Sequence, residues 1–493
     1  MPRSIFPRLQ DLDWFSRDGR LPKTIIHHAP LLPNLRVLSV PRHLANIDLF
    51  LLDVLDLFRL LACHSSLRKL YLNFEDIYHT NLGQGIAGVI ERNTQLNSLY
   101  LSEDFMTSTD VSEAIWKHPN LTELTLEENE EPGIPKEYPF LLPSLTKLTF
   151  LNAPLPAALH LLQPCSSTSL TTISIVSLLP LENMWSMSKT LITIIGNECP
   201  ALEKLEIAHG FDNPLEHTNS HSVPGSALHP LRSCRELQVV SIQFHLGYTD
   251  PWDDDIFSLR PEFNLGDDDF EHLLANWPKL VLFEFDIGSM IDPTIKQLPR
   301  PRATCKTLIH FAKNCPMLQE LQLALDLSTT LSSETIDSTH SLPDTMQSVR
   351  LQRSWIPTVS LERTRLAYAL WQVTRLSLLF LVEGPSHATW SGVRGLDLDI
   401  AQYRVEVEPD LQPSAEAAER FACWAGVEEI AKKLFLYEDV FLQIIREVSR
   451  EDIDAWLQGL ETHEAILDAL DELSPRRHNR FRTWAGNRME WDL

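Results

Sequence analysis

A short apolar pattern recurs through most of the chain and constrains its fold more strongly than any other feature. The pattern reads Leu-x-x-Leu-x-Leu and often follows Pro-x, as in PNLTELTL from Pro119 and PSLTKLTF from Pro143. The first apolar residues of its successive copies are Leu9, Leu35, Leu67, Leu96, Leu121, Leu145, Leu170, Leu202, Leu237, Leu280 and Leu318. The interval is 24 residues between Leu121 and Leu145 and 43 residues between Leu237 and Leu280. The chain is therefore an array of similar units with insertions of unequal length.

Alternation within each copy predicts a β-strand with one buried face. In PNLTELTL, Leu124 and Leu126 lie on one side of the strand, whereas Glu123 and Thr125 lie on the other. One unit cannot bury its leucines alone, but stacked units bury them in a continuous core. The spacing of the middle copies is typical of leucine-rich repeats, which predicts a solenoid with a curved parallel sheet.

The segments between the strands predict helices on the outside of the sheet. The segment from Ser108 has a weak capping box that starts at Thr109. Acidic residues from Asp267 suit the start of a second helix, and the segment from Thr304 carries the apolar stripe of a third. Each segment ends at a proline, which cannot continue a helix. The expected fold class is α/β: a leucine-rich-repeat solenoid with outer helices, followed by a helical C-terminal region.

In this architecture the polar alternate positions of the strands line the concave face, where we expect a protein partner to bind. Large amphipathic aromatic residues are frequent hot spots of binding, and Tyr71 and Tyr100 occupy equivalent places on neighbouring strands. The residues expected to bind the partner are Lys69, Tyr71, Tyr100, Glu123, Thr125, Lys147, Lys204, Glu206, Glu284, Glu320 and Gln322.

The charge balance argues against nucleic acid and anionic membranes as partners. The formal net charge is −25, which repels polyanions unless a local basic patch overrides it. The densest basic cluster, at Arg476, Arg477, Arg480 and Arg482, is surrounded by acidic segments. A protein partner, and a chain that is monomeric outside its complex, are the expectations.

Cysteine usage and the absence of targeting signals favour the cytoplasm or the nucleus. The seven cysteines include no CxxC pair, which argues against a disulfide framework and a structural zinc site. The N-terminal segment shows no secretory signal. No apolar run approaches the roughly 20 residues that a membrane-spanning helix needs.

None of the motifs that carry catalysis is convincing, and we expect neither an enzyme nor a bound cofactor or metal. GQGIAG from Gly83 matches a dinucleotide-binding fingerprint only loosely, and we interpret it as a turn into a repeat helix. The prolines around His217 and His221 predict a loop in place of a metal-binding helix face. The acidic run from Asp250 lacks the spacing of a calcium loop.

Two units with nearly the same sequence carry a resemblance to a known family. NECPALEKLEI from Asn197 and KNCPMLQELQL from Lys313 place Cys199 and Cys315 three residues before the leading leucine, as Cys234 also stands. This unit resembles the cysteine-containing leucine-rich repeat of F-box proteins, in particular that of fungal F-box proteins, over about residues 7–326. The resemblance implies a substrate-recognition solenoid, joined through an F-box to the Skp adaptor of a cullin-type ubiquitin ligase. The cysteines themselves are expected to be small buried hydrophobic residues.

This sequence departs from the family pattern at its N-terminus, since the first repeat begins at Pro7 with no F-box before it. A truncated chain and a divergent member that lost its F-box both stay open. A segment from Leu436 resembles the opening of an F-box, although Tyr437 stands where the family has proline. Its apolar residues, which would contact the adaptor, are Leu436, Val440, Phe441, Ile444, Ile445 and Val448. A helical cap that closes the solenoid is the other interpretation of this segment.

The expected organisation has four parts. They are the solenoid at 7–326, irregular or degenerate terminal repeats at 327–404, a linker at 405–414 and the helical C-terminal region at 415–493. Functionally, a protein-interaction scaffold like the recognition part of a ubiquitin ligase is the first expectation. A leucine-rich-repeat regulator or inhibitor of a cytosolic protein, without ligase function, is the alternative.

Overall fold

The computed structural model describes a set of segments that carry most of the repeats. They are residues 11–13, 37–40, 58–59, 61–62, 67–72, 80–102, 108–127, 142–151, 158–159, 162, 169–178, 184–210, 222–245, 262–287, 301–327, 342–343, 345–346, 348–351 and 379–380. The chain divides into two compact units, Met1–His217 with Ala227–Asp253, and Thr218–Ser226 with Asp254–Leu493. The C-terminal region expected at 415–493 lies outside the described residues.

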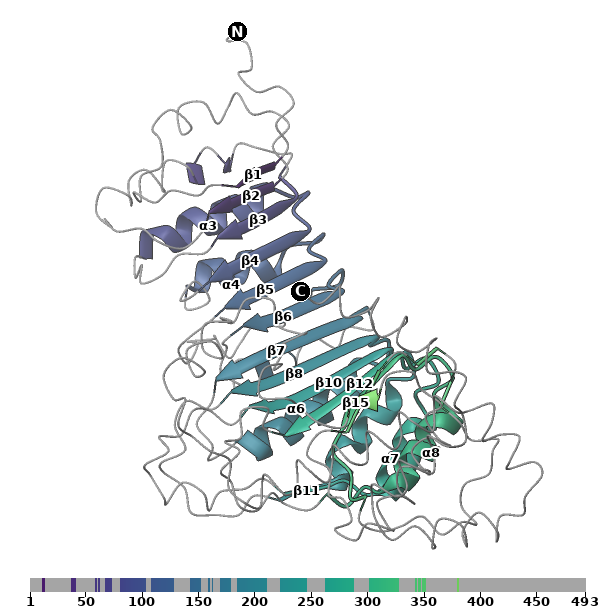
Figure 1. Ribbon diagram of the computed structural model, residues 1–493. Coiled ribbons are helices and arrows are strands. Elements are labelled where there is room, and N and C mark those ends of the chain that lie inside the picture. The colour runs from purple at the N-terminus through teal and green to yellow at the C-terminus, as the bar shows by residue number, and fades with distance from the viewer. Residues whose placement is uncertain are drawn as a thin grey trace, which may run out of the picture. The chain divides into compact units, whose positions relative to one another are not determined.

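Parallel strands that pair in sequence order form the sheet of the first unit (Figure 1). The strands are β1 (Asp11–Asp13), β2 (Val37–Val40), β3 (Lys69–Leu72), β4 (Ser98–Ser102), β5 (Glu123–Glu127), β6 (Lys147–Leu151), β7 (Thr172–Leu178), β8 (Lys204–Gly210) and β10 (Val239–His245). The register matches the repeat, because Leu70 pairs with Leu99 and Leu99 with Leu124. These three leucines are buried, so the predicted core face is confirmed.

Hydrogen bonds fix where each strand begins. The carbonyl of Asn97, one residue after a leading leucine, accepts the backbone N–H groups of Thr122 and Glu123, both at 2.9 Å. The Thr122 hydroxyl donates to the same carbonyl at 2.9 Å. The Thr146 hydroxyl in turn donates to Thr122 O at 3.1 Å, and the Thr171 hydroxyl to Thr146 O at 3.2 Å. Threonine at this position thus links consecutive repeats.

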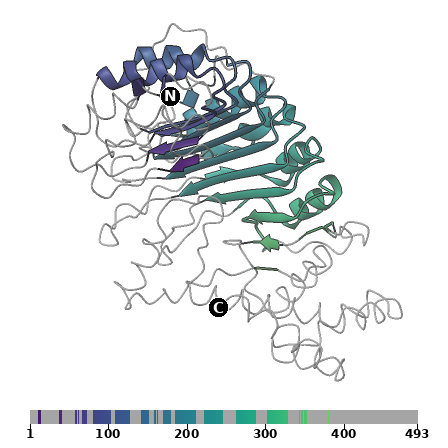
Figure 2. The ribbon, with the colours of Figure 1, turned by 90° about the horizontal axis from the view of Figure 1, so that it is seen from above.

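Helices cover the core face of the first unit. They are α3 (Thr80–Arg92), α4 (Thr109–Trp116) and α6 (Met184–Glu198), together with the 3-10 helix η4 (Gly225–Ser233), whose first two residues fall in the second unit. Figure 2 shows α3 and α4, in blue, side by side on one side of the strands. The proposed capping box at Thr109 is wrong. Ser108 is the N-cap residue of α4 and makes no side-chain capping bond, and Thr109 already lies inside the helix.

We expected the glycines of GQGIAG to form a turn before a helix, and this prediction is wrong. They lie inside α3. A methyl group on Gly83 would overlap the hydroxyl of Ser108, which shows how closely α3 approaches the start of α4. Gly83 therefore permits the packing of two helices, which a side chain would obstruct.

The second unit repeats the arrangement with fewer described strands. Its parallel strands are β12 (Leu282–Ile287), β13 (Glu320–Leu323), β14 (Ser348–Arg350) and β15 (Leu379–Phe380). Its helices are α7 (Asp267–Leu274) and α8 (Cys305–Asn314). Phe270, Phe283 and Phe311 are buried together, with ring centroids 5.1 to 6.0 Å apart. β14 and β15 lie within the irregular or degenerate terminal repeats expected at 327–404.

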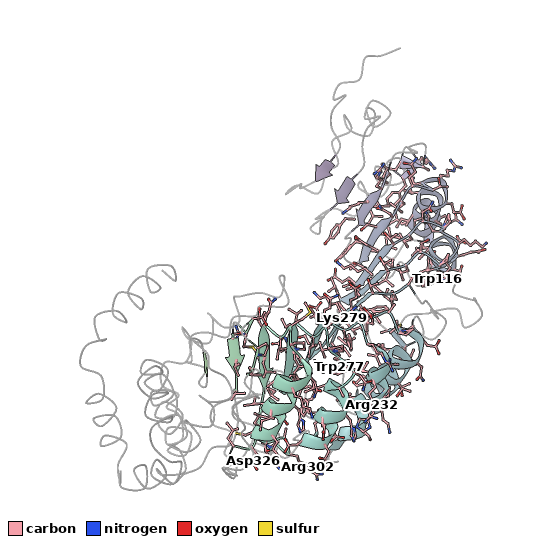
Figure 3. The ribbon with its side chains drawn as sticks, turned by 90° about the vertical axis from the view of Figure 1, so that its right-hand side faces the viewer. Trp116, Arg232, Trp277, Lys279, Arg302 and Asp326 are labelled. Carbon is pink, nitrogen blue, oxygen red and sulfur yellow. The ribbon has the colours of Figure 1, made fainter. Side chains whose placement is uncertain are left out.

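A second parallel ladder in this unit precedes the helices. β9 (Ser222–Pro224) pairs with β11 (Glu262–Asn264), and bridges join Gly266 to Arg302 and Thr304 to Asp326. Figure 3 labels Arg302 and Asp326 close together and apart from Trp277 and Lys279, which lie at the turn before β12. The loop expected around His217 to Pro224 thus includes a short strand.

Several residues that stand three positions before a leading leucine are buried and contact a carbonyl of the repeat before it. The His118 ring nitrogen Nε2 lies 3.1 Å from the carbonyl of Asn93, and the Cys234 thiol lies 3.4 Å from that of Cys199. In the second unit, the Cys315 thiol lies 3.8 Å from Trp277 O. His118, Cys234 and Cys315 share this position, and each side chain can donate to a carbonyl.

Replacing His118 by asparagine is expected to reduce the acid sensitivity of folding. Burial lowers the pKa of His118, against a smaller opposing effect of the Asn93 carbonyl. Below about pH 6.5 the unfolded chain therefore takes up a proton that the folded chain does not. The free energy of unfolding decreases as the pH is lowered. The measurement is the shift of the urea midpoint between about pH 7.5 and about pH 5. Equal shifts for H118N and the wild type would contradict this role.

Candidate functional site

The concave face of the first unit carries two rows of side chains in register. One row contains Lys69, Ser98, Glu123, Lys147, Thr172 and Lys204. The other contains Tyr71, Tyr100, Thr125, Thr149, Ser174 and Glu206. All of these side chains are exposed or half-buried, whereas the leucines between them are buried. The residues of this unit that the sequence predicts to bind a partner therefore lie together on one face of the sheet, and their role in binding stays a prediction.

Tyr71 and Tyr100 form a stacked pair, with ring centroids 3.8 Å apart and planes at 18°. The pair follows from the repeat, since equivalent positions on neighbouring strands lie about 4.8 Å apart. The Tyr100 hydroxyl donates a hydrogen bond to Oε2 of Glu127 on the next strand. Glu127 is 8% exposed, so a carboxylate is held at the rim of the aromatic pair.

The hydroxyl of Tyr100 stays protonated under all ordinary conditions. Burial raises its pKa most, and the hydrogen bond to Glu127 and the nearby Tyr71 raise it further. The protonated hydroxyl of Tyr100 donates to the Glu127 carboxylate and holds it in place.

Glu127 is not among the residues that the sequence predicts to bind a partner. The alternation of β5 does place it on the same side as Glu123 and Thr125. Its contact with Tyr100 is diagonal, because Tyr100 pairs with Thr125 in the register and Glu127 with Ser102. The strand pattern gives the face of a residue but not the direction in which a long side chain leans.

The far side of the concave face carries an ion pair. Lys204 Nζ and Glu206 Oε1 of β8 are 2.8 Å apart, with side chains 42% and 29% exposed. In the row that contains Tyr71 and Tyr100, only short hydroxyl side chains lie between Tyr100 and Glu206. They are Thr125, Thr149 and Ser174. These three short side chains form a polar floor between the larger side chains at the two ends of that row.

In the second unit the expected residues Glu284, Glu320 and Gln322 lie on neighbouring strands and are half-buried. Gln322 pairs with Arg350 in the register, and Arg350 Nη1 lies 3.5 Å from Gln322 Oε1. The six apolar residues expected to contact an adaptor, from Leu436 to Val448, lie outside the described residues.

The described cysteines are buried and unreactive in character. Cys199, Cys234, Cys305 and Cys315 are free thiols with at most 1% exposure. Burial raises the pKa of Cys234 to about 11, and that of Cys315 to about 12. Burial also raises the pKa of Cys305 to about 12, with Asp267 and Asp326 adding to the effect. They fill the core, as the sequence predicts, and are poor nucleophiles.

Two other kinds of structural feature are absent from the described segments. No three metal-ligating side chains gather there. Among the helices of those segments, none combines the length and the apolar character that crossing a bilayer requires.

No family model and no curated protein matches the sequence. Among solved structures, the chain is similar to the Drosophila Toll–Spatzle complex, with 13% identity, a TM-score of 0.36, and coverage of 72% of this chain and 46% of that one. It is also similar to the mouse RP105/MD-1 complex, with 14% identity, a TM-score of 0.28, and coverage of 70% and 67%. The yeast Rad7–Elc1 complex gives 13% identity, a TM-score of 0.25, and coverage of 58% and 76%.

The chain spans about half the length of the Toll chain that it matches. The fold assignment comes from the repeat and from the parallel register of its strands. On those grounds, the chain is an α/β leucine-rich-repeat solenoid.

Proposed function

We propose that this chain is a protein-interaction scaffold whose concave face binds a partner protein. The observation that carries the proposal is the pair of in-register rows on the first unit, with stacked tyrosines at one side and an ion pair at the other. The buried leucine core beneath holds the rows in place, so little ordering entropy is lost on binding. Aromatic anchors beside a polar floor are the composition that protein interfaces favour.

The specific form of this proposal is a substrate receptor of a cullin-type ubiquitin ligase in the cytoplasm or nucleus. Its support is the resemblance of the cysteine-containing repeats to those of F-box proteins. In this form the solenoid holds the substrate, and the segment from Leu436 to Val448 binds the Skp adaptor. A regulator that binds a cytosolic protein without an adaptor is the competing form.

The scaffold is tested by selecting binders to the full chain from a library of displayed random peptides. Thr149→Arg places a long cation in the middle of the polar floor and should abolish binding of the selected peptides. Thr190→Arg, the same change at an exposed site on α6, is the matched control and should leave binding intact. Binders that ignore both changes would contradict the concave site.

The ligase form is tested separately by pull-down of purified Skp adaptor. Phe441→Asp with Ile445→Asp should remove adaptor binding, whereas Thr149→Arg should not. If the unaltered chain retains no adaptor, the receptor form is wrong and the scaffold proposal stands on the peptide result alone.

A further inference from the structure

Three oxygen-bearing side chains gather at one place on the concave face of the first unit. Tyr71, Tyr100 and Glu127 come from the neighbouring strands β3, β4 and β5. The rings stack and Tyr100 donates to Glu127, while the hydroxyl of Tyr71 is close enough to Tyr100 to raise its pKa. All three side chains are electron-rich, and together they form a small acidic, aromatic cluster.

The geometry of the cluster leaves a specific surface for a ligand. Stacking covers the inner faces of the two rings, so each ring can accept a ligand group only on its outer face or along its edge. Both tyrosines are half-exposed, and Glu127 is nearly buried beside them. A group that binds here therefore meets the outer face or the edge of a ring, beside the nearly buried carboxylate of Glu127.

We propose that the cluster of Tyr71, Tyr100 and Glu127 is a pocket for an arginine side chain of the partner protein. This inference rests on the proposed scaffold function and names the chemistry of its ligand. A guanidinium group stacks on an aromatic ring and directs N–H groups from its edge to a carboxylate, which matches both parts of the cluster. The net charge of −25 attracts a basic segment over a longer range.

Lysine fits the cluster less well than arginine. An ammonium group is a compact and strongly hydrated charge that cannot stack flat on a ring. Lys69 also lies two residues before Tyr71 on the same strand and is exposed. Its positive charge opposes any cation nearby, so the bound cation needs the directional contacts that the guanidinium provides.

The test begins with peptides selected from a random displayed library on the full chain. They should be enriched in arginine, and a synthetic peptide of the best sequence should bind at least about tenfold more weakly with citrulline or lysine in place of that arginine. Glu127→Gln should weaken the arginine peptide by about tenfold or more. Glu91→Gln removes the same charge from an exposed position on α3, away from the strands, and should change affinity less than about threefold.

A second variant keeps the result interpretable if Glu127→Gln lowers stability. Tyr71→Leu removes the half-exposed ring while leaving Glu127 and Tyr100 in place, and should weaken the arginine peptide by a similar factor. The urea unfolding midpoint of each variant shows whether that variant is folded under the conditions of the binding measurement.

Equal effects of Glu127→Gln and Glu91→Gln, or equal binding of the lysine peptide, would overturn the arginine pocket. If Thr149→Arg still removes binding in that case, the scaffold proposal survives while this inference fails. If selection on the full chain yields no peptide sensitive to any concave variant, both are wrong.

Discussion

Alanine at Gly196 is expected to destabilise the first unit by about 3 kcal/mol or more. Gly196 is buried near the end of α6, and a methyl group there would overlap the backbone carbonyl of Pro230 in η4. The Ser233 hydroxyl bonds to the carbonyl of Gly196 and also, at 2.9 Å, to that of Pro230. Relief of the overlap would require the two segments to separate, because a backbone carbonyl cannot rotate away.

Two other helical glycines in the same unit are the matched controls. A methyl group at Gly88 in α3 meets nothing within 4 Å, so Gly88→Ala should stabilise by about 0.5–1 kcal/mol through helix propensity. At Gly83 the obstacle is the side chain of Ser108, and the loss should be intermediate. Urea midpoints should therefore increase in the order Gly196→Ala, Gly83→Ala, wild type, Gly88→Ala. A wild-type midpoint for Gly196→Ala would contradict the close approach.

These glycines show where inference from the sequence ends. The alternation of Leu124 and Leu126 with Glu123 and Thr125 depends only on strand geometry, and it predicts the core face and the register. Gly196 has no room for a side chain because of the backbone of Pro230, which lies 34 positions away in the sequence. Nothing within a repeat indicates that contact, since the intervening insertions differ in length from unit to unit.

The candidate site divides in the same way. Tyr71 and Tyr100 occupy equivalent repeat positions, so their proximity could be predicted. The contact of Tyr100 with Glu127 could not, because it crosses the register diagonally. The acidic start of α7 is a similar case. The sequence favours Asp267 as a residue that suits its own helix, whereas the structure directs its carboxylate to the next helix.

Alanine at Asp267 is expected to destabilise the second unit by about 3 kcal/mol, since it removes three hydrogen bonds to a charged acceptor. Asp267 Oδ1 accepts from Thr304 N at 2.8 Å and from the Thr307 hydroxyl at 2.6 Å. Its Oδ2 accepts from the Thr304 hydroxyl at 2.7 Å. The carboxylate thus caps the first turn of α8 and joins it to the start of α7.

Asp268 provides the control, because it is exposed in the same first turn of α7 and its replacement by alanine removes the same charge. Asp268→Ala should change stability by less than about 0.5 kcal/mol. Urea unfolding gives the loss, and amide hydrogen exchange over residues 305–314 should accelerate in Asp267→Ala alone. Thr307→Val removes one fully buried partner, so its effect should shrink markedly in the Asp267→Ala background. Additive losses, or equal effects of the two aspartates, would show that Asp267 stabilises its own helix only, as the sequence alone suggests.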